Sequence, residues 1–130
     1  MPNNRDYRFD ITAPTEDRRR EFKRSGPWNQ LKFKIARAAL AMANTHGGGL
    51  IVLGVQDDGQ GCTPAGMSGD HMETYNDDEI KTFVNQHADP YVSCSIYRAA
   101  IDEKKFIVID VAEFEEFPVV CKRSCNDEKN

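Results

Sequence analysis

Two stretches of the sequence carry side chains that could act together on a phosphodiester bond. The run from Glu16 to Lys23 (EDRRREFK) mixes carboxylates with cations, and Asp57 and Asp58 follow an apolar segment. Phosphodiester hydrolysis requires charge neutralisation on a nonbridging oxygen and an activated water, and carboxylate-held Mg²⁺ or Mn²⁺ supplies both. A lysine beside such a site, here Lys23, would stabilise the pentacovalent state. We therefore treat these two stretches as one candidate site.

The same residues also have simpler interpretations. Glu21 and Lys23 could form a neutralising pair on a surface strand, and Asp57-Asp58-Gly59 is a common turn sequence. The triple glycine at 47–49 could cradle a phosphate, but phosphate loops run from a strand into a helix, whereas the order here is helix to strand. His46 is then interpreted as a turn residue. The residues alone leave these alternatives open.

The elements that must position the site are a helix, a glycine turn and a buried strand. The helix is predicted to begin at Pro27, with Ser25 or Gly26 as its cap, and to end near Asn44. One apolar stripe runs along it, formed by Leu31, Ile35, Ala38, Ala39 and Met42. The glycines turn the chain into residues 50–55, whose continuous apolar character predicts a strand buried on both faces.

The remaining pattern predicts a small mixed sheet. Alternation places Glu21 and Lys23 on one face of a strand and Phe22 on the other, toward a core. A second helix begins at the Asn76 cap and stops before Pro90, and His71 before it is expected to be exposed. Two strands at 91–101 and 105–111 form a hairpin, followed by a solvated acidic loop at 113–116 and an extended piece at 117–120.

The expected fold class is α+β (mixed α/β), a mixed β-sheet flanked by two main helices in a single lobe. Residues 1–15 are predicted to be an N-terminal arm, 16–121 the domain and 122–130 a polar tail. No apolar run approaches the roughly 20 residues that span a bilayer, and the N-terminus has no secretory signal. We therefore expect a cytoplasmic protein with no membrane partner.

Charge is distributed unevenly along the 130 residues. The net charge is −4, but residues 1–37 carry ten Lys or Arg against five Asp or Glu, and the remainder is strongly acidic. A phosphate-binding face needs local positive potential rather than a basic whole protein. The predicted nucleic-acid-binding residues are Arg18, Arg19, Arg20, Lys23, Arg24, Lys32 and Lys34. On charge alone, a solvated surface run is an equal alternative.

Four blocks of the sequence together resemble the Schlafen/AlbA-type domain. They are Glu16-x4-Glu21-Phe22-Lys23, Ala41-x-Ala43-Asn44-Thr45-x-Gly47-Gly48, Leu53-Gly54-Val55-Gln56-Asp57-Asp58-Gly59 and Asp89-Pro90. The resemblance covers most of residues 16–120. It implies a mixed sheet flanked by helices. In the nuclease branch of the family, three carboxylates cleave tRNA or rRNA with a divalent metal; bacterial members are described as ATP-binding or DNA-binding regulators.

Carried onto this chain, the resemblance places the three carboxylates at Glu16, Glu21 and Asp57. Asp58 competes for the third place, and Lys23 follows Glu21 as in the family's E-F-K run. Gln56 stands where many members have an acidic residue, so part of the usual cluster is absent. Schlafen cores pair two lobes around a groove, which implies that a single-lobe chain could form a homodimer.

These observations predict a metal-dependent endoribonuclease that cleaves tRNA-like or other structured RNA. Its catalytic residues would be Glu16, Glu21, Asp57 and Lys23, and its Mg²⁺ or Mn²⁺ ligands Glu16, Glu21, Asp57 and Asp58. The alternative is a non-catalytic module of a transcriptional regulator that binds DNA, RNA or ATP. A third hypothesis is a protein-interaction domain in which the acids are structural.

Overall fold

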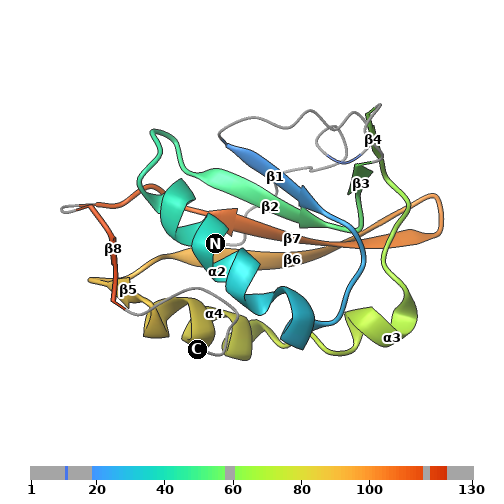
Figure 1. Cartoon of the computed structure of the whole chain (residues 1–130). Helices are drawn as coiled ribbons and strands as arrows, with labels where there is room; N and C mark the ends of the chain where they lie inside the picture. The colour runs from blue at the N-terminus through green and yellow to red at the C-terminus, as the bar shows by residue number, and fades with distance from the viewer. Residues whose placement is uncertain (1–10, 12–18, 58–60, 116–117, 123–130) are drawn as a thin grey trace.

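A computed structural model of the chain describes residues 11, 19–57, 61–115 and 118–122 (Figure 1). Its centre is a four-stranded sheet in the order β1-β2-β7-β6. The strands are β1 (Arg20–Lys23), β2 (Gly49–Leu53), β7 (Lys104–Val111) and β6 (Cys94–Ile101). β1 is parallel to β2, whereas the β2–β7 and β7–β6 pairs are antiparallel. The mixed sheet predicted from the sequence is confirmed.

Two helices, α2 (Trp28–Ala43) and α4 (Asp77–Gln86), lie against one face of this sheet, and α2 crosses in front of β2 and β7 (Figure 1). A third helix, α3 (Gly69–Met72), is a single short turn. Two small antiparallel pairs complete the described elements: β3 (Gln56–Asp57) with β4 (Cys62–Thr63), and β5 (Ala88–Asp89) with β8 (Val120–Cys121). The α+β class with two main helices is therefore confirmed.

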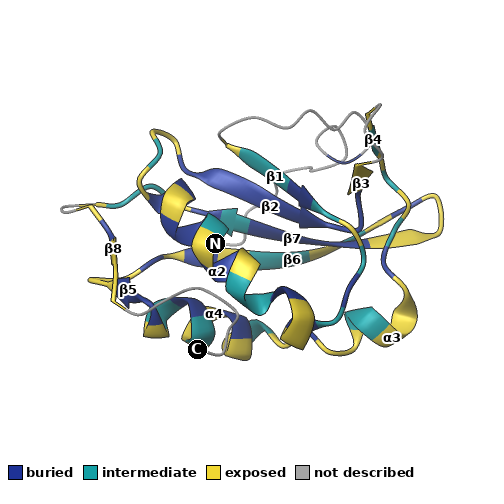
Figure 2. Cartoon of the chain, in the orientation of Figure 1, coloured by how far each residue is buried: buried dark blue, intermediate teal, exposed yellow. Residues whose placement is uncertain are grey.

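The sheet is buried on both faces at its centre. On the helix side, Ile51 and Leu53 of β2 join the larger core cluster, while Leu50 and Val52 face the opposite way into a second cluster. Ile11, fully buried, belongs to that second cluster. Figure 2 shows β2 dark blue along its length, whereas α2 and α4 alternate between buried and exposed. Each fully buried aliphatic side chain stabilises the fold by about 1.5–3 kcal/mol.

The start of α2 differs from the sequence prediction. Pro27 occupies the N-cap position and has no capping side chain, so neither Ser25 nor Gly26 caps the helix. The Trp28 N–H instead donates to Thr74 Oγ1 at 2.8 Å, a partner 46 residues away. A cap supplied by a distant segment satisfies the orphan amide equally well, but local sequence does not reveal it.

The end of α2 leads into the glycine turn as predicted. Gly47 and Gly48 have φ of +86° and +72°, values that L side chains rarely adopt. A Cβ on Gly48 would also lie 2.1 Å from the Val111 carbonyl oxygen. The turn is thus fixed by close approach of two backbones, and no side chain larger than hydrogen fits there.

The second half of the chain follows the expected order. Asn76 Oδ1 accepts from the Glu79 N–H at 2.9 Å, which confirms the predicted cap of α4. Asp102 and Glu103 both have positive φ, as a two-residue hairpin turn with the right-handed strand twist requires. Of the last extended piece predicted at 117–120, only Val120 lies in a strand among the described residues, because β8 covers Val120–Cys121. No helix among the described residues is long and apolar enough to cross a membrane.

Candidate functional site

The candidate site begins on β1, an outer strand of the described sheet. Glu21 and Lys23 pair in register with Ile51 and Leu53, whose side chains face the helices, so both charged side chains lie on the helix-bearing face. Phe22 is buried on the opposite face. The predicted alternation of β1 is confirmed.

Glu21 and Lys23 contact each other directly. Lys23 Nζ lies 2.8 Å from Glu21 Oε2, with 23% and 35% of the two side chains exposed. An ion pair this accessible to solvent stabilises a fold by about 0–1 kcal/mol. The pair is therefore a weak structural element, and both groups remain accessible to a ligand.

Asp57 reaches the same end of the sheet through the turn that follows β2. The N–H groups of Gly54 and Val55 donate to the Lys23 carbonyl at 2.7 and 3.1 Å, which carries the chain across the end of β1. Asp57 follows in β3, is exposed, and β3 contacts β1. The structure thus brings Asp57 to the end of the strand that carries Glu21 and Lys23.

The other two predicted carboxylates, Glu16 and Asp58, lie outside the described residues, as does the predicted cation Arg18. Within the described ranges, no group of three Asp, Glu, His or Cys residues gathers as a metal site. The described candidates are Glu21 and Asp57. Mg²⁺ commonly uses one or two carboxylates together with water and substrate phosphate oxygens, so this hard oxygen donor set fits the predicted metal.

A hydrogen-bonded clamp holds the chain just beyond β1. Ser25 Oγ lies 2.7 Å from His71 Nδ1 and accepts from the Ser68 N–H at 3.0 Å. The Tyr75 hydroxyl donates to the Gly26 carbonyl at 2.7 Å, and burial raises the pKa of this phenol, so it stays a neutral donor. We call residues 25–28 and 68–75 the α3 clamp.

The clamp corrects the expectation that His71 is exposed, because His71 is half-buried against Ser25. The sequence interpretation also left out α3 itself. The sequence did carry a local signal, because serine is a common N-cap residue. In the structure Ser68 is the N-cap of α3, and its Oγ accepts from the His71 N–H three residues later. In a four-residue helix, that signal is easily taken for a turn.

The predicted cations do not all gather at this end of the sheet. Arg19 lies at the opposite end of β1, where its guanidinium donates to the Gly47 and Gly48 carbonyls at 3.1 and 3.3 Å. Lys32 sits over the Phe83 ring of α4, with Nζ 5.1 Å from the ring centroid. These two cations have roles inside the fold.

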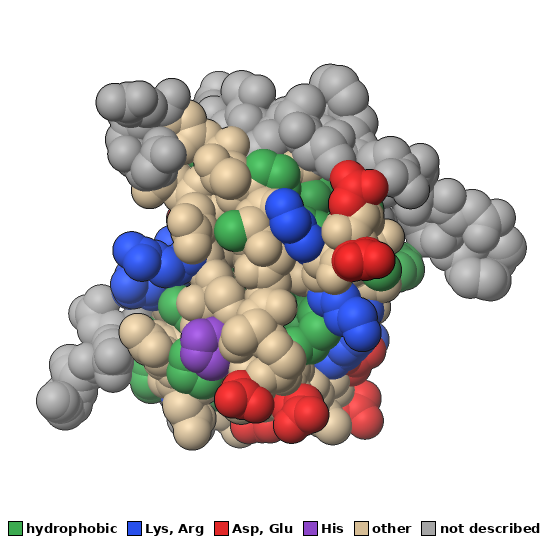
Figure 3. Space-filling model, turned by 90° about the vertical axis from the view of Figure 1, so that its right-hand side faces the viewer, with side chains coloured by type: hydrophobic (Ala, Val, Ile, Leu, Met, Phe, Trp, Pro, Cys, Tyr) green, Lys and Arg blue, Asp and Glu red, His purple; other side chains and the backbone are tan. Residues whose placement is uncertain are grey.

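Two other predicted cations are exposed and one lies on the opposite face of the sheet. Lys34 is exposed on the outer side of α2, and Arg24 is exposed directly after β1. Arg20 alternates with Glu21 and so lies on the other face of the sheet. Viewed from the end that holds β3 and α3, basic and acidic side chains are interleaved over the described surface (Figure 3). Lys23, on the same face as Glu21, and Arg24, directly after β1, are therefore the predicted cations that lie at the carboxyl end of this strand.

The sequence of this mixed sheet and its helices matches the model of one protein family, Schlafen, AlbA_2, over residues 16–129. The chain belongs to the Schlafen/AlbA_2 family. No curated protein matches it by sequence.

Two solved structures share the Schlafen/AlbA_2 fold of this chain. One is the N-terminal domain of a RecG-related protein from Nitrosomonas europaea, with a TM-score of 0.59 and 19% identity, covering 86% of this chain and 75% of that one. The other is DIP2311 from Corynebacterium diphtheriae, with a TM-score of 0.57 and 20% identity over 85% of this chain. The chain spans only 22% of DIP2311. At these identities the likeness concerns the fold alone.

Proposed function

We propose that this Schlafen/AlbA_2 domain is a divalent-metal-dependent endoribonuclease that cleaves tRNA-like or other structured RNA. Glu16, Glu21 and Asp57 would hold Mg²⁺ or Mn²⁺, with Asp58 as the competing ligand. The observation that carries the proposal is the Lys23–Glu21 pair on β1 together with the contact of β1 with β3, the exposed strand that carries Asp57. Family membership supports it, because the family includes nucleases.

The Lys23–Glu21 pair suggests separate chemical roles for the two residues. Lys23 neutralises Glu21 while no other cation is present. Glu21 would help to hold the metal, and the Lys23 ammonium would contact a nonbridging phosphate oxygen, where charge develops in the transition state. The bound metal would supply phosphate neutralisation and a water of lowered pKa. Arg24 and Lys34 would then hold the flanking RNA phosphates.

A cleavage assay tests this assignment. Purified protein is incubated with tRNA and Mn²⁺, with and without EDTA, beside Glu21→Gln and the control Asp78→Asn. Asp78 is an exposed carboxylate in the first turn of α4. We expect EDTA to stop cleavage, Glu21→Gln to slow it by about 100-fold or more, and Asp78→Asn to leave it unchanged. Cleavage that survives Glu21→Gln in a folded protein would overturn the site assignment.

The second candidate function is a nucleic-acid-binding module without catalysis. One observation favours it: Glu21 is already neutralised by Lys23, an arrangement that suits phosphate binding as well as metal binding. The name of the RecG-related neighbour refers to a DNA helicase, which makes DNA a reasonable partner; ATP is another. Metal-independent binding of RNA or DNA, with affinity falling steeply as salt rises and no cleavage, would favour this candidate.

Homodimer formation can be tested in the same preparation. Two lobes would be needed to enclose an RNA groove if each domain supplies one wall. Sedimentation with and without tRNA distinguishes a dimer in solution from one formed on the substrate. A strict monomer in both conditions, together with full cleavage, would show that one lobe is sufficient.

A further inference from the structure

A cavity lies at the opposite end of the sheet from the candidate nuclease site. It is a cavity of about 270 Å³, between the end of α2, the segment entering β6 and the segment leaving β7. Its lining residues are Ala43, Pro90, Tyr91, Ser93, Ala112, Glu113, Phe114 and Glu115. This volume lies just below the range of about 300–1,000 Å³ for small-molecule pockets, so it holds a group of side-chain size.

Backbone hydrogen bonds fix the walls of this cavity. The Phe114 N–H donates to the Ala43 carbonyl at 2.8 Å, which attaches the segment after β7 to the end of α2. The Ala112 N–H donates to the Ser93 carbonyl at 2.9 Å and attaches it to the start of β6. Three elements are thereby held around the space, so the cavity is built into the fold.

The charged side chains that line the cavity are both negative. Glu113 and Glu115 line it, and no Lys or Arg in the described part of the chain does so. The carboxyl end of α2 adds the negative end of a helix dipole at Ala43, and the last turn of that helix carries no basic residue. The sequence interpretation of 113–116 as a solvated acidic loop is therefore incomplete, because two of its glutamates line a cavity.

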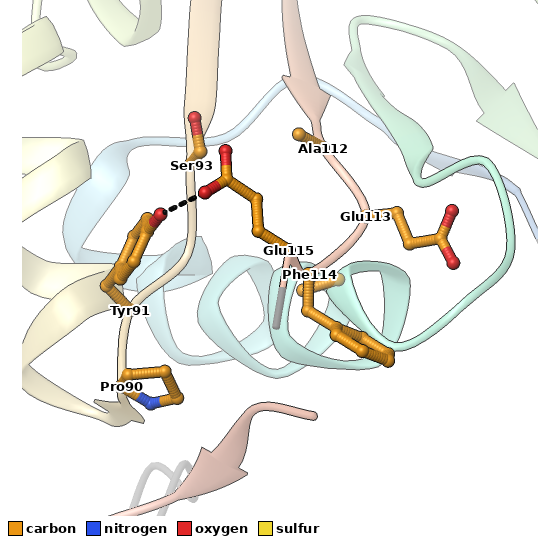
Figure 4. A pocket seen from close by; sticks show the side chains of 8 residues that line it. Pro90, Tyr91, Ser93, Ala112, Glu113, Phe114 and Glu115 are labelled. Carbon is orange, nitrogen blue, oxygen red and sulfur yellow. Dashed lines mark hydrogen bonds between the residues drawn. The ribbon is translucent and has the colours of Figure 1, made fainter. Parts of the chain in front are cut away.

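Figure 4 shows how these groups are arranged. Tyr91 and Pro90 stand on one side and Ala112 and Phe114 on the other, with Glu115 between them. The Tyr91 hydroxyl donates to Glu115 Oε1 at 3.1 Å, which orients the carboxylate. Glu113 points toward the glycine turn, where it accepts from the Gly47 N–H at 3.0 Å. Glu115 is thus the carboxylate that lies between the two sides of the cavity, and it remains exposed to solvent.

We propose that this cavity binds an alkyl cation, a guanidinium or primary ammonium group on a short carbon chain. Glu115 is the counter-ion, and the Tyr91 and Phe114 rings contact the stem and the cationic head, as aromatic faces do in cation sites. The shared chemistry has two sources: a free alkylamine or alkylguanidine, or an Arg or Lys side chain of a protein. The proposal does not depend on nuclease activity.

A titration with two probes of matched shape tests the proposal on the full chain. ¹⁵N-labelled protein is titrated with butylguanidinium and, separately, with butylurea, which has nearly the same shape and no charge. We expect saturable amide shifts at Tyr91, Ser93 and Ala112 with the cation and none with the urea. Equal shifts from both probes, or no saturation with the cation, would overturn the proposal.

Variants then assign the binding to Glu115. Glu115→Gln should weaken butylguanidinium binding at least 10-fold, and Tyr91→Leu, which removes one wall, should also weaken it. Glu73→Gln is the matched control, since Glu73 is an exposed carboxylate beside α3 at the other end of the molecule. Unchanged affinity in folded Glu115→Gln, or an equal loss in Glu73→Gln, would contradict the assignment.

A peptide arm separates the two sources. The blocked peptide acetyl-Gly-Arg-Gly-amide is titrated beside butylguanidinium under the same conditions. At least 10-fold tighter binding of the peptide indicates a protein side chain as the natural occupant, whereas equal or weaker binding indicates a free amine or guanidine. If neither butylguanidinium nor the peptide binds, the proposed cation site is contradicted.

Discussion

The two ends of the central sheet are built by different physical means. At the carboxyl ends of β1 and β2, charged side chains stand on strands of four residues or fewer, and the Lys23–Glu21 pair is accessible to solvent. At the amino end of β2, backbone meets backbone so closely that Gly48 tolerates no Cβ. One end presents accessible charged side chains, and the other is fixed by shape.

This difference separates function from stability. The groups around the glycine turn are engaged with one another: Arg19 donates to two turn carbonyls, and Glu113 accepts from the Gly47 N–H. Substitutions there should lower the free energy of unfolding. At the carboxyl end, the charged groups contribute little to folding because water already solvates them. Substitutions there should change activity and leave the fold intact.

The largest effect is expected from Gly48→Ala. The new Cβ would lie 2.1 Å from the Val111 carbonyl oxygen at a φ of +72°, so both the close approach and the turn must change. We expect a loss of about 3 kcal/mol or more in the free energy of unfolding, measured by urea denaturation. Gly69→Ala, whose Cβ would meet nothing within 4 Å, is the matched control and should be near neutral.

A smaller loss is expected from Asn44→Ala at the same end. The Asn44 amide donates to the Val119 carbonyl and accepts from the Val119 N–H, both at 2.8 Å, and so takes the place of a neighbouring strand. Val119 is buried, so its backbone groups would lose their partners. We expect about 1–3 kcal/mol of destabilisation. Faster amide exchange at Val119 is the specific readout, and unaltered exchange there would contradict this role.

High pH should weaken the α3 clamp. Because burial raises the pKa of Tyr75, the unfolded chain releases its phenolic proton first, near pH 10. Stability is therefore unaffected below about pH 9 and falls as pH rises above about 10. Between pH 8 and pH 10.5, the melting temperature of the wild type should fall by more than that of Tyr75→Phe. The same decline in both proteins would show that other groups cause it.

The smallest effect on stability is expected from Lys23→Met. Loss of an accessible ion pair should cost less than about 1 kcal/mol by urea denaturation. RNA affinity should nevertheless fall. The magnitude of the slope of log affinity against log salt should decrease by about 1, the amount expected for the loss of one phosphate contact. A large loss of stability without a change in salt slope would contradict the view that charges at this end affect binding more than folding.

Local patterns predicted the elements but not how distant segments support them. Alternation was sufficient for β1, because Phe22 between two charged residues has one buried face. The Asn76 cap and the hairpin turn were likewise local. The Thr74 cap of α2 and the Asn44–Val119 pairing join residues 46 and 75 positions apart, and no local periodicity encodes them.

The candidate site was predictable in composition more than in geometry. The carboxylates and Lys23 came from motif blocks, and the structure brings Glu21, Lys23 and Asp57 to one end of the sheet. The charge pattern did not predict that Arg19 would donate to carbonyls of the glycine turn. Such a pattern does not indicate which cations form hydrogen bonds within the fold. The cavity around Glu115 was missed for a related reason: its walls come from three separate segments.

The place of β7 between β2 and β6 has a consequence for synthesis on the ribosome. Glu21, Lys23 and Asp57 all leave the exit tunnel early, yet β2 acquires its second neighbour only when residues 107–111 have emerged. Until then, β1 and β2 are a lone parallel pair with an apolar edge, a species that depends on non-local pairing and is open to aggregation. A nascent chain arrested before Val111 therefore carries every described candidate residue of the site without the sheet that orients them.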